Sequence, residues 1–177
     1  PQSGRDRELT QFGVEVLGSS DPAIDAEVIS VAVNIFKLLG LKGIKVKINS
    51  LGDTESRDNY RKALIEYFEP HISELCPDCN ERLKKNPLRI LDCKFDANLD
   101  VINNSPTILD YLNEDSKNRF EKLQEYLDLM EIDYFVDTNL VRGLDYYNHT
   151  VFEIVLRGST LALGGGGRYD TLVEMLD

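Results

Sequence analysis

Strand-type sequence is confined to the two ends of this chain, and a long helical, charge-rich segment separates them. Residues 44–50 alternate Ile or Val with Lys or Asn, and residues 150–156 form a β-branched and aromatic run, so both predict strands. Residues 54–136 carry mainly helical periodicity. Strand, helix and strand make an α/β or α+β unit. We therefore interpret 54–136 as a helical insertion between two parts of one core, residues 1–53 and 137–177.

The first strand-type pattern lies at residues 10–17, "TQFGVEVL". Its strict alternation predicts a strand with apolar side chains on the core face and Gln11, Gly13 and Glu15 on the other. Glycine weakens a strand, so Gly13 favours a small polar ligand between the amide and the carboxylate over an ordinary amphipathic edge strand. Residues 21–39 then predict a helix, with a proline near the start and acidic residues in the first turn.

Charge limits the partners of the chain. The net charge is −11, from 20 Lys and Arg against 31 Asp and Glu, and this field repels phosphate, which argues against non-specific binding to nucleic acid. Any contact with RNA must therefore be local. The candidate is a basic cluster at residues 82–94 that contains Lys84, Lys85 and Arg89. A solvated helix face with its loop explains the same cluster without a ligand.

Length and hydropathy point to a globular protein. With 177 residues and 42% apolar residues, the chain can bury one core, or one core and a small lobe. It has no apolar run long enough to cross a bilayer, and its polar first residues do not fit a signal peptide, so we expect a cytoplasmic protein without membrane contact. Because it starts abruptly at "PQSGR" without methionine, we expect a fragment of a larger protein.

The chain has three cysteines, Cys76 and Cys79 in "CPDC" and the distant Cys93. A structural zinc site requires four ligands, and His71 and His149 stand at spacings that match no familiar zinc finger. We therefore expect reduced cysteines and neither zinc nor any other bound metal. The alternative is a zinc-stabilised helical interaction protein built around "CPDC".

Residues 141–154, "VRGLDYYNHTVFEI", crowd a cation, a carboxylate and two phenols ahead of a predicted strand. Arg142 can donate two parallel hydrogen bonds to a carboxylate or phosphate, and together with the tyrosines it suits an anionic ligand with a polar ring. A structural pair of Arg142 with Asp145 fits the spacing too. Residues 164–170, "GGGGRYD", predict a glycine-rich turn ahead of a helix at 171–176. The run lacks the Lys and Ser/Thr of a P-loop, and its glycines would let a substrate approach the backbone, with Arg168 and Tyr169 beside it.

These segments resemble one family. "LVRGLDYYNHTVFE" and "GGGGRYDTLVE" are similar to the histidine-specific signatures of histidyl-tRNA synthetases, which are class II aminoacyl-tRNA synthetases. "PQSG" and "QFGVEVLGSSDPAIDAEVI" resemble the end of motif 2 and the strand and helix after it, and "INSLGD" and "NPLRILDCK" also match the family. The resemblance spans nearly the whole chain. It implies an α+β fold, an incomplete antiparallel-sheet class II catalytic core with a mostly helical insertion.

The resemblance also implies a site. Gln11 would hold the amino group of the substrate histidine and Glu15 its imidazole, and Arg142 would be catalytic, lying against the substrate carboxylate and the α-phosphate of ATP. Three tyrosines are implied around the imidazole: Tyr146, Tyr147 and Tyr169.

The implied partners follow from the same resemblance. Arg5 and Arg7 would meet ATP, with Mg²⁺ assisting on the phosphates. Lys84, Lys85 and Arg89 would contact tRNA(His), because the insertion leans on the acceptor arm in this family. The reaction would be formation of histidyl-adenylate and transfer to tRNA, in a full-length homodimer.

The chain departs from the family pattern after Arg7, where Leu9 and Thr10 stand in place of an aromatic residue and a histidine. Leucine cannot stack on adenine as phenylalanine can. Several family segments have no counterpart in the chain, so we expect it to activate histidine weakly or not at all by itself. The alternative is a non-catalytic paralogue, either the regulatory subunit of ATP phosphoribosyltransferase or a sensor of histidine or tRNA.

Overall fold

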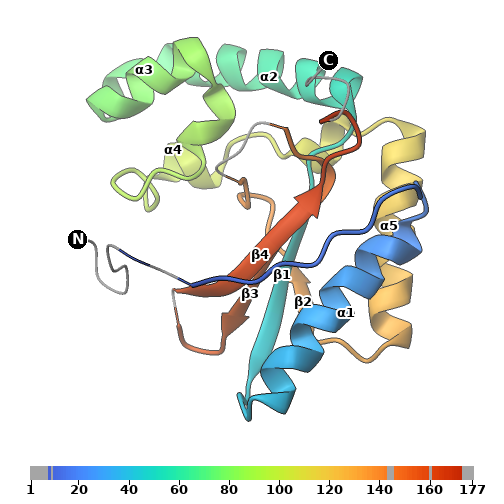
Figure 1. Cartoon of the computed structure of the whole chain (residues 1–177). Helices are drawn as coiled ribbons and strands as arrows, with labels where there is room; N and C mark the ends of the chain where they lie inside the picture. The colour runs from blue at the N-terminus through green and yellow to red at the C-terminus, as the bar shows by residue number, and fades with distance from the viewer. Residues whose placement is uncertain (1–7, 9, 143–145, 160, 173–177) are drawn as a thin grey trace.

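The computed structural model describes residues 8, 10–142, 146–159 and 161–172. Its centre is a four-stranded sheet in the order β2-β1-β3-β4 (Figure 1). The strands are β1 (Ile44–Ser50), β2 (Tyr134–Val136), β3 (Asn148–Leu156) and β4 (Ala162–Arg168). β2 runs parallel to β1, while the β1–β3 and β3–β4 pairs are antiparallel. The predicted α+β class and the pairing of strands from both ends of the chain are confirmed.

Two helices cover one face of this sheet: α1 (Pro22–Leu38) and α5 (Glu114–Leu129) (Figure 1). Each begins at a side-chain cap, because Asp21 accepts from the N–H of Ala23 at 2.8 Å and Asn113 accepts from the N–H of Ser116 at 2.9 Å. Their apolar stripes pack with the sheet into one core. Its buried members are Ala26, Ile29, Val33, Val46, Ile48, Phe120, Leu123, Leu127, Ile132, Phe152 and Ile154.

The other helices form a unit with a core of its own, residues 54–112. Its elements are α2 (Thr54–Phe68), η1 (Glu69–Glu74), α3 (Pro77–Lys85), η2 (Pro87–Ile90), α4 (Asp100–Asn103) and η3 (Ile108–Tyr111). We call it the helical unit; its core includes the fully buried Leu64 and Phe68. It occupies the first part of the range interpreted as an insertion, 54–136, whereas α5 and β2 from the rest of that range pack on the sheet.

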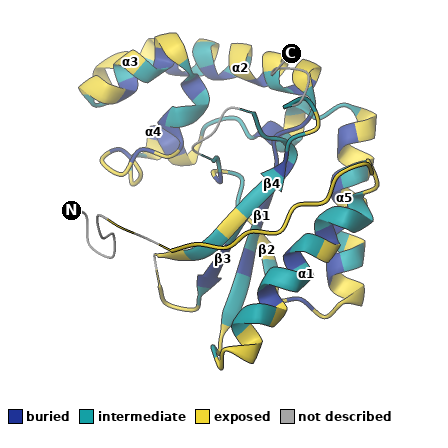
Figure 2. Cartoon of the chain, in the orientation of Figure 1, coloured by how far each residue is buried: buried dark blue, intermediate teal, exposed yellow. Residues whose placement is uncertain are grey.

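Two local expectations differ from the structure. Residues 10–17 are not a strand: no ladder joins them to the described strands, and Phe12 is 68% exposed. The segment ahead of α1 is exposed and is drawn in yellow in Figure 2. The glycines of "GGGG" lie inside β4 and not in a turn, because they pair with β3. α2 begins at a side-chain cap, because Asp53 accepts from the N–H of Ser56 at 2.8 Å. The helix predicted at 171–176 lies mostly outside the described residues.

Candidate functional site

The face of the sheet opposite α1 and α5 carries the predicted cation. Alternate residues of β3 point to opposite faces, so Phe152 and Ile154 enter the helix-covered core while Glu153 lies on the other side. The Arg142 Nη1 atom lies 2.6 Å from Glu153 Oε1, and both side chains are about three-quarters buried. A charge-assisted hydrogen bond therefore holds the guanidinium at this open face.

The glycine run of β4 makes the room for this face. A Cβ on Gly165 would lie 3.0 Å from Arg142 Nη1, and a Cβ on Gly167 would lie 2.8 Å from Tyr147 Cδ1. At both positions it would also lie 2.7 Å from a backbone oxygen of β3, which real Cβ atoms do not approach. The two other glycines of the run face aromatic rings of the core. The run therefore serves two packed faces of one strand.

Three tyrosines meet over this face. The ring centroids of Tyr146 and Tyr147 lie 4.7 Å apart, and those of Tyr146 and Tyr169 lie 5.8 Å apart. The Tyr169 hydroxyl is buried and makes no hydrogen bond of normal geometry within the described structure. A buried polar atom without a partner is costly, so this hydroxyl suits a polar atom of a ligand.

Glu15 belongs to the same environment although it comes from the exposed segment ahead of α1. Burial and the carboxylate of Glu15 raise the pKa of Tyr169 to about 12. The pKa of Tyr147 is raised above its ordinary value, mainly by burial and by Tyr146. The charge of Arg142 lowers this pKa, and the carboxylate of Glu15 raises it further. The structure therefore brings together one acid, one guanidinium and the phenols. Gln11 is exposed and makes no hydrogen bond to them in the part that is described.

A buried amide that sequence reasoning missed supports the loop ahead of Arg142. Asn49 is fully buried near the end of β1, and its Nδ2 donates to the carbonyls of Thr138 at 3.2 Å and Leu140 at 3.1 Å. Glu153, the partner of Arg142, was missed as well. In both cases the available signal was a polar residue within an otherwise buried strand.

A cleft of about 290 Å³ joins the open face to the helical unit. The peptide oxygen of Tyr147 accepts a hydrogen bond from Arg57 of α2, which ties the two walls together. Lys85 and Arg89 of the predicted tRNA site line this cleft beside Arg142, whereas Lys84 is outside its lining. The complete lining is Leu51, Arg57, Asp58, Arg61, Lys85, Asn86, Leu88, Arg89, Val141, Arg142 and Tyr147.

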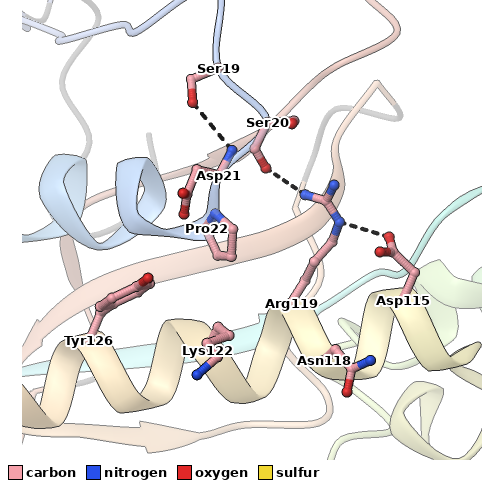
Figure 3. A pocket seen from close by; sticks show the side chains of 9 residues that line it. All are labelled: Ser19, Ser20, Asp21, Pro22, Asp115, Asn118, Arg119, Lys122 and Tyr126. Carbon is pink, nitrogen blue, oxygen red and sulfur yellow. Dashed lines mark hydrogen bonds and ion pairs between the residues drawn. The ribbon is translucent and has the colours of Figure 1, made fainter.

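A larger hollow of about 480 Å³ lies between the start of α1 and α5 (Figure 3). Arg119 crosses it and donates to the carbonyl of Ser20 at 2.6 Å and to Asp115 at 2.8 Å. Its cation is thus committed to holding the turn ahead of α1 against α5. None of the predicted site residues lines this hollow.

Arg168 also has a structural role. Its guanidinium is nearly buried and lies 2.8 Å from both Asp25 and Asp170, and it donates to the carbonyl oxygens of Ser19 and Asp21. It fixes the end of β4 to the start of α1 and leaves Tyr169 as the side chain of that pair that faces the site.

The predicted ATP contacts Arg5 and Arg7, and the substituted Leu9, lie outside the described residues. Thr10 is exposed. Their roles stay predictions.

The expectation of no metal rested on a missing set of ligands, and the fold supplies that set. The ligand atoms of Cys76, Cys79, Cys93 and Asp96 all lie within 4.8 Å of one another. Sequence reasoning missed Asp96, which stands three residues after Cys93. Both come from the turn that follows η2, and they meet the start of α3.

Comparison with known proteins gives a consistent result. The family model described as histidyl-tRNA synthetase matches residues 1–177. A relative named histidine–tRNA ligase, from Oceanobacillus iheyensis, is 58% identical over 178 residues, which cover 98% of this chain. The chain spans 42% of the length of that relative.

Solved structures share the fold. The apo histidyl-tRNA synthetase of S. aureus superposes with a TM-score of 0.69 and 44% identity, over 90% of this chain and 39% of that one. A protein from Bacillus halodurans C described as an ATP phosphoribosyltransferase regulatory subunit/histidyl-tRNA synthetase gives a TM-score of 0.55 and 23% identity, over 89% of this chain and 45% of that one. The second similarity concerns the fold alone.

Proposed function

The chain belongs to the histidyl-tRNA synthetase family, and from that premise we propose that it forms the histidine-binding part of a class II histidine–tRNA ligase. The observation that carries the proposal is the buried hydroxyl of Tyr169, which faces Glu15 without a hydrogen bond of normal geometry, on a face that also holds Arg142. The proposed reaction of the whole protein is activation of histidine by ATP, followed by transfer to tRNA(His).

Histidine would be selected through its ring. An imidazole has one N–H donor and one acceptor nitrogen when neutral, and Glu15 and the Tyr169 hydroxyl offer an acceptor and a donor. A side chain of similar size without these atoms would leave both groups unpaired, which is the strongest basis for rejecting a competitor. Tyr146 and Tyr147 would form the apolar walls.

Arg142 would act on the reacting atoms. A carboxylate oxygen of histidine attacks the α-phosphorus of ATP, the bond to pyrophosphate breaks, and negative charge concentrates where the two substrates meet. A guanidinium fixed in advance stabilises that charge without reorganisation. Its Nη1 is held by Glu153, and its buried Nε has no partner among the described residues, so donors remain for the substrate.

ATP, Mg²⁺ and the homodimer are further parts of the proposal. Mg²⁺ bound to the phosphates would supply additional positive charge, and the described residues assign it no ligand. Arg5 and Arg7 stay the proposed ATP contacts. The helices of the described part include none long and apolar enough to span a membrane, and a cytoplasmic location stays a prediction.

The basic cleft is the proposed entry for the tRNA acceptor end. Lys85 and Arg89 lie in it together with Arg142, so a phosphate bound there would place the adjoining ribose near the activated carboxyl group. Both lysines are exposed and lie near Glu81, at 3.8 Å for Lys84 and 3.9 Å for Lys85, but Lys84 lies outside that lining. We assign it a weaker contact for this reason.

Glu15→Gln tests the histidine site. The substitution keeps the shape and removes the charge, and a hydrogen bond to a charged group is worth about 1.5–3 kcal/mol. We expect histidine affinity, measured on this chain by isothermal titration calorimetry, to fall about 10–150-fold. Glu8→Gln, an exposed acid of the same segment, is the matched control. Equal affinities of the two variants would remove Glu15 from the site.

Histidinol separates the ring contacts from the carboxylate contacts, because it lacks the carboxylate. Arg142→Gln should weaken the binding of histidine strongly and that of histidinol much less, whereas Glu15→Gln should weaken both. A non-catalytic paralogue would bind histidine without histidine-dependent pyrophosphate exchange in the whole protein. The 58% identity to the relative named histidine–tRNA ligase favours the ligase.

A further inference from the structure

The helical unit contains a closed set of four potential metal ligands. Cys79, Cys93 and Asp96 are buried, Cys76 is half-buried, and their ligand atoms lie within 4.8 Å of one another. The thiols of Cys76 and Cys93 are 3.8 Å apart. That separation is far longer than a disulfide bond of about 2.05 Å. Two sulfur atoms on one tetrahedral zinc, each at about 2.3 Å from the metal, lie about 3.8 Å apart.

We propose that Cys76, Cys79, Cys93 and Asp96 bind one zinc ion that joins the start of α3 to the turn after η2. Thiolates are soft ligands that favour zinc over magnesium or calcium, and a carboxylate oxygen is an accepted fourth ligand. All four positions of a tetrahedron come from the protein, which is the arrangement of structural and not catalytic zinc.

The local structure is arranged for this role. Cys76 is the N-cap of α3 and Pro77 its first residue, so Cys79 lies one turn along and both thiols emerge from the same helix start. The N–H of Cys76 donates to Asp96 Oδ2 at 3.0 Å. This bond orients the carboxylate and ties the two segments together before any metal binds, as the outer hydrogen bonds of metal sites do.

The ion would stabilise a small core. Cys79 and Cys93 belong to the same hydrophobic cluster as Leu83 and Ile90. The helical unit has 3-10 turns and short helices around that cluster, and small cores commonly depend on a metal or a disulfide. Because a preformed site is absent from the unfolded chain, binding energy at this site is folding energy.

The test is the metal content of this chain. The chain, purified without chelators and with any affinity tag removed, should contain one zinc per molecule by mass spectrometry of the elements. Blocking the thiols with a mercurial should release that zinc to a chromogenic chelator. Cobalt in place of zinc should give thiolate-to-cobalt charge-transfer absorption and the ligand-field bands of a tetrahedral site.

Asp96→Asn tests the fourth ligand, and Asp92→Asn is its control, because Asp92 is an exposed acid of the same turn. In competition with a chelator, Asp96→Asn should weaken zinc affinity by at least the roughly 10–100-fold typical of losing an outer-shell partner. Asp92→Asn should leave the affinity unchanged. Equal affinities of the two variants would overturn the assignment of Asp96.

Cys93→Ser should lose the zinc altogether. Because a variant that fails to fold would also lose zinc, the decisive measurement is made on the intact chain. If the intact, folded chain contains no zinc, takes up no cobalt and shows no rise in melting temperature when zinc is added, the site does not exist. None of these readouts depends on histidine binding, so the outcome is independent of the proposed function.

Discussion

The open face of the sheet and the cysteine cluster of the helical unit are built in opposite ways. The open face collects Glu15, Arg142 and Tyr169 from distant parts of the chain, and in the described structure the Arg142 Nε and the Tyr169 hydroxyl make no hydrogen bond of normal geometry. The cluster draws its groups from residues 76–96 and holds them within 4.8 Å. A site for a substrate that binds and leaves keeps polar groups available for hydrogen bonds to that substrate. A site for a permanently bound ion surrounds the ion with ligands.

The largest expected effect concerns the independence of the helical unit. Phe68 is fully buried in that core, and Phe→Ala in a core costs about 3–5 kcal/mol. Phe68→Ala should lower the free energy of unfolding by about that amount, as measured by urea denaturation followed by circular dichroism. Phe95→Ala is the matched control, because Phe95 belongs to the same unit and is 84% exposed. If the two variants are equally stable, the helical unit has no separate core.

The next effect concerns the open face. Gly167→Ala would place a Cβ 2.7 Å from the carbonyl of Thr150 and 2.8 Å from Tyr147 Cδ1. Overpacking of this kind costs about 1–3 kcal/mol. We expect that loss of stability together with weaker histidine binding, since the ring of Tyr147 must move. Gly13→Ala, where a Cβ meets open space, is the control for stability. A neutral Gly167→Ala would mean that the glycine run is not required for packing.

The two regions differ in how far the sequence predicts them. The strand at 44–50 and the helix at 21–39 follow from periodicity and caps, because those signals are local, and the structure has β1 and α1 there. The run "GGGG" was misread as a turn, because glycine signals both turns and close packing, and only the pairing with β3 decides. The alternation at 10–17 also gave a wrong prediction of a strand. An alternating pattern shows which face of a strand would be buried, but it does not show whether another layer of the protein covers that face.

The candidate site shows the same limit. Family motifs predict Arg142 and the tyrosines as site residues, but the glutamate that holds Arg142 and the amide that supports its loop are set by tertiary contacts. The cluster of Cys76, Cys79, Cys93 and Asp96 was missed because Asp96 is an ordinary acid in sequence. Only the return of the chain after η2 brings it to "CPDC".

A smaller effect concerns the cleft between the two regions. Each phosphate neutralised by a lysine contributes about 0.7–0.9 to the slope of log affinity against log salt concentration. Lys85→Gln should reduce the salt slope of tRNA(His) binding by about that amount, and Lys84→Gln by less, because only Lys85 lines the cleft. Lys37→Gln, at the exposed end of α1, is the control. A larger effect of Lys84→Gln would relocate the contact to the outer surface of α3.

The smallest effect compares two buried tyrosines, one from each region. Burial raises the pKa of Tyr60 in the helical unit, where its hydroxyl donates to the carbonyl of Pro106 at 2.9 Å. Burial and Glu15 raise the pKa of Tyr169 to about 12. A raised pKa gives a stability contribution that is complete below the unfolded value, about 10, and is lost as the pH rises toward the folded value.

Both tyrosines should therefore stay neutral when exposed tyrosines ionise, and their absorbance change should come last in a spectrophotometric titration. Tyr169→Phe should remove a component of the absorbance change that occurs at high pH and that added histidine shifts, because histidine hydrogen-bonds to the Tyr169 hydroxyl. Tyr60→Phe should remove a late component that histidine leaves unchanged, since its hydroxyl is already satisfied. If histidine shifts neither component, or shifts both, the imidazole does not bind at the Tyr169 hydroxyl.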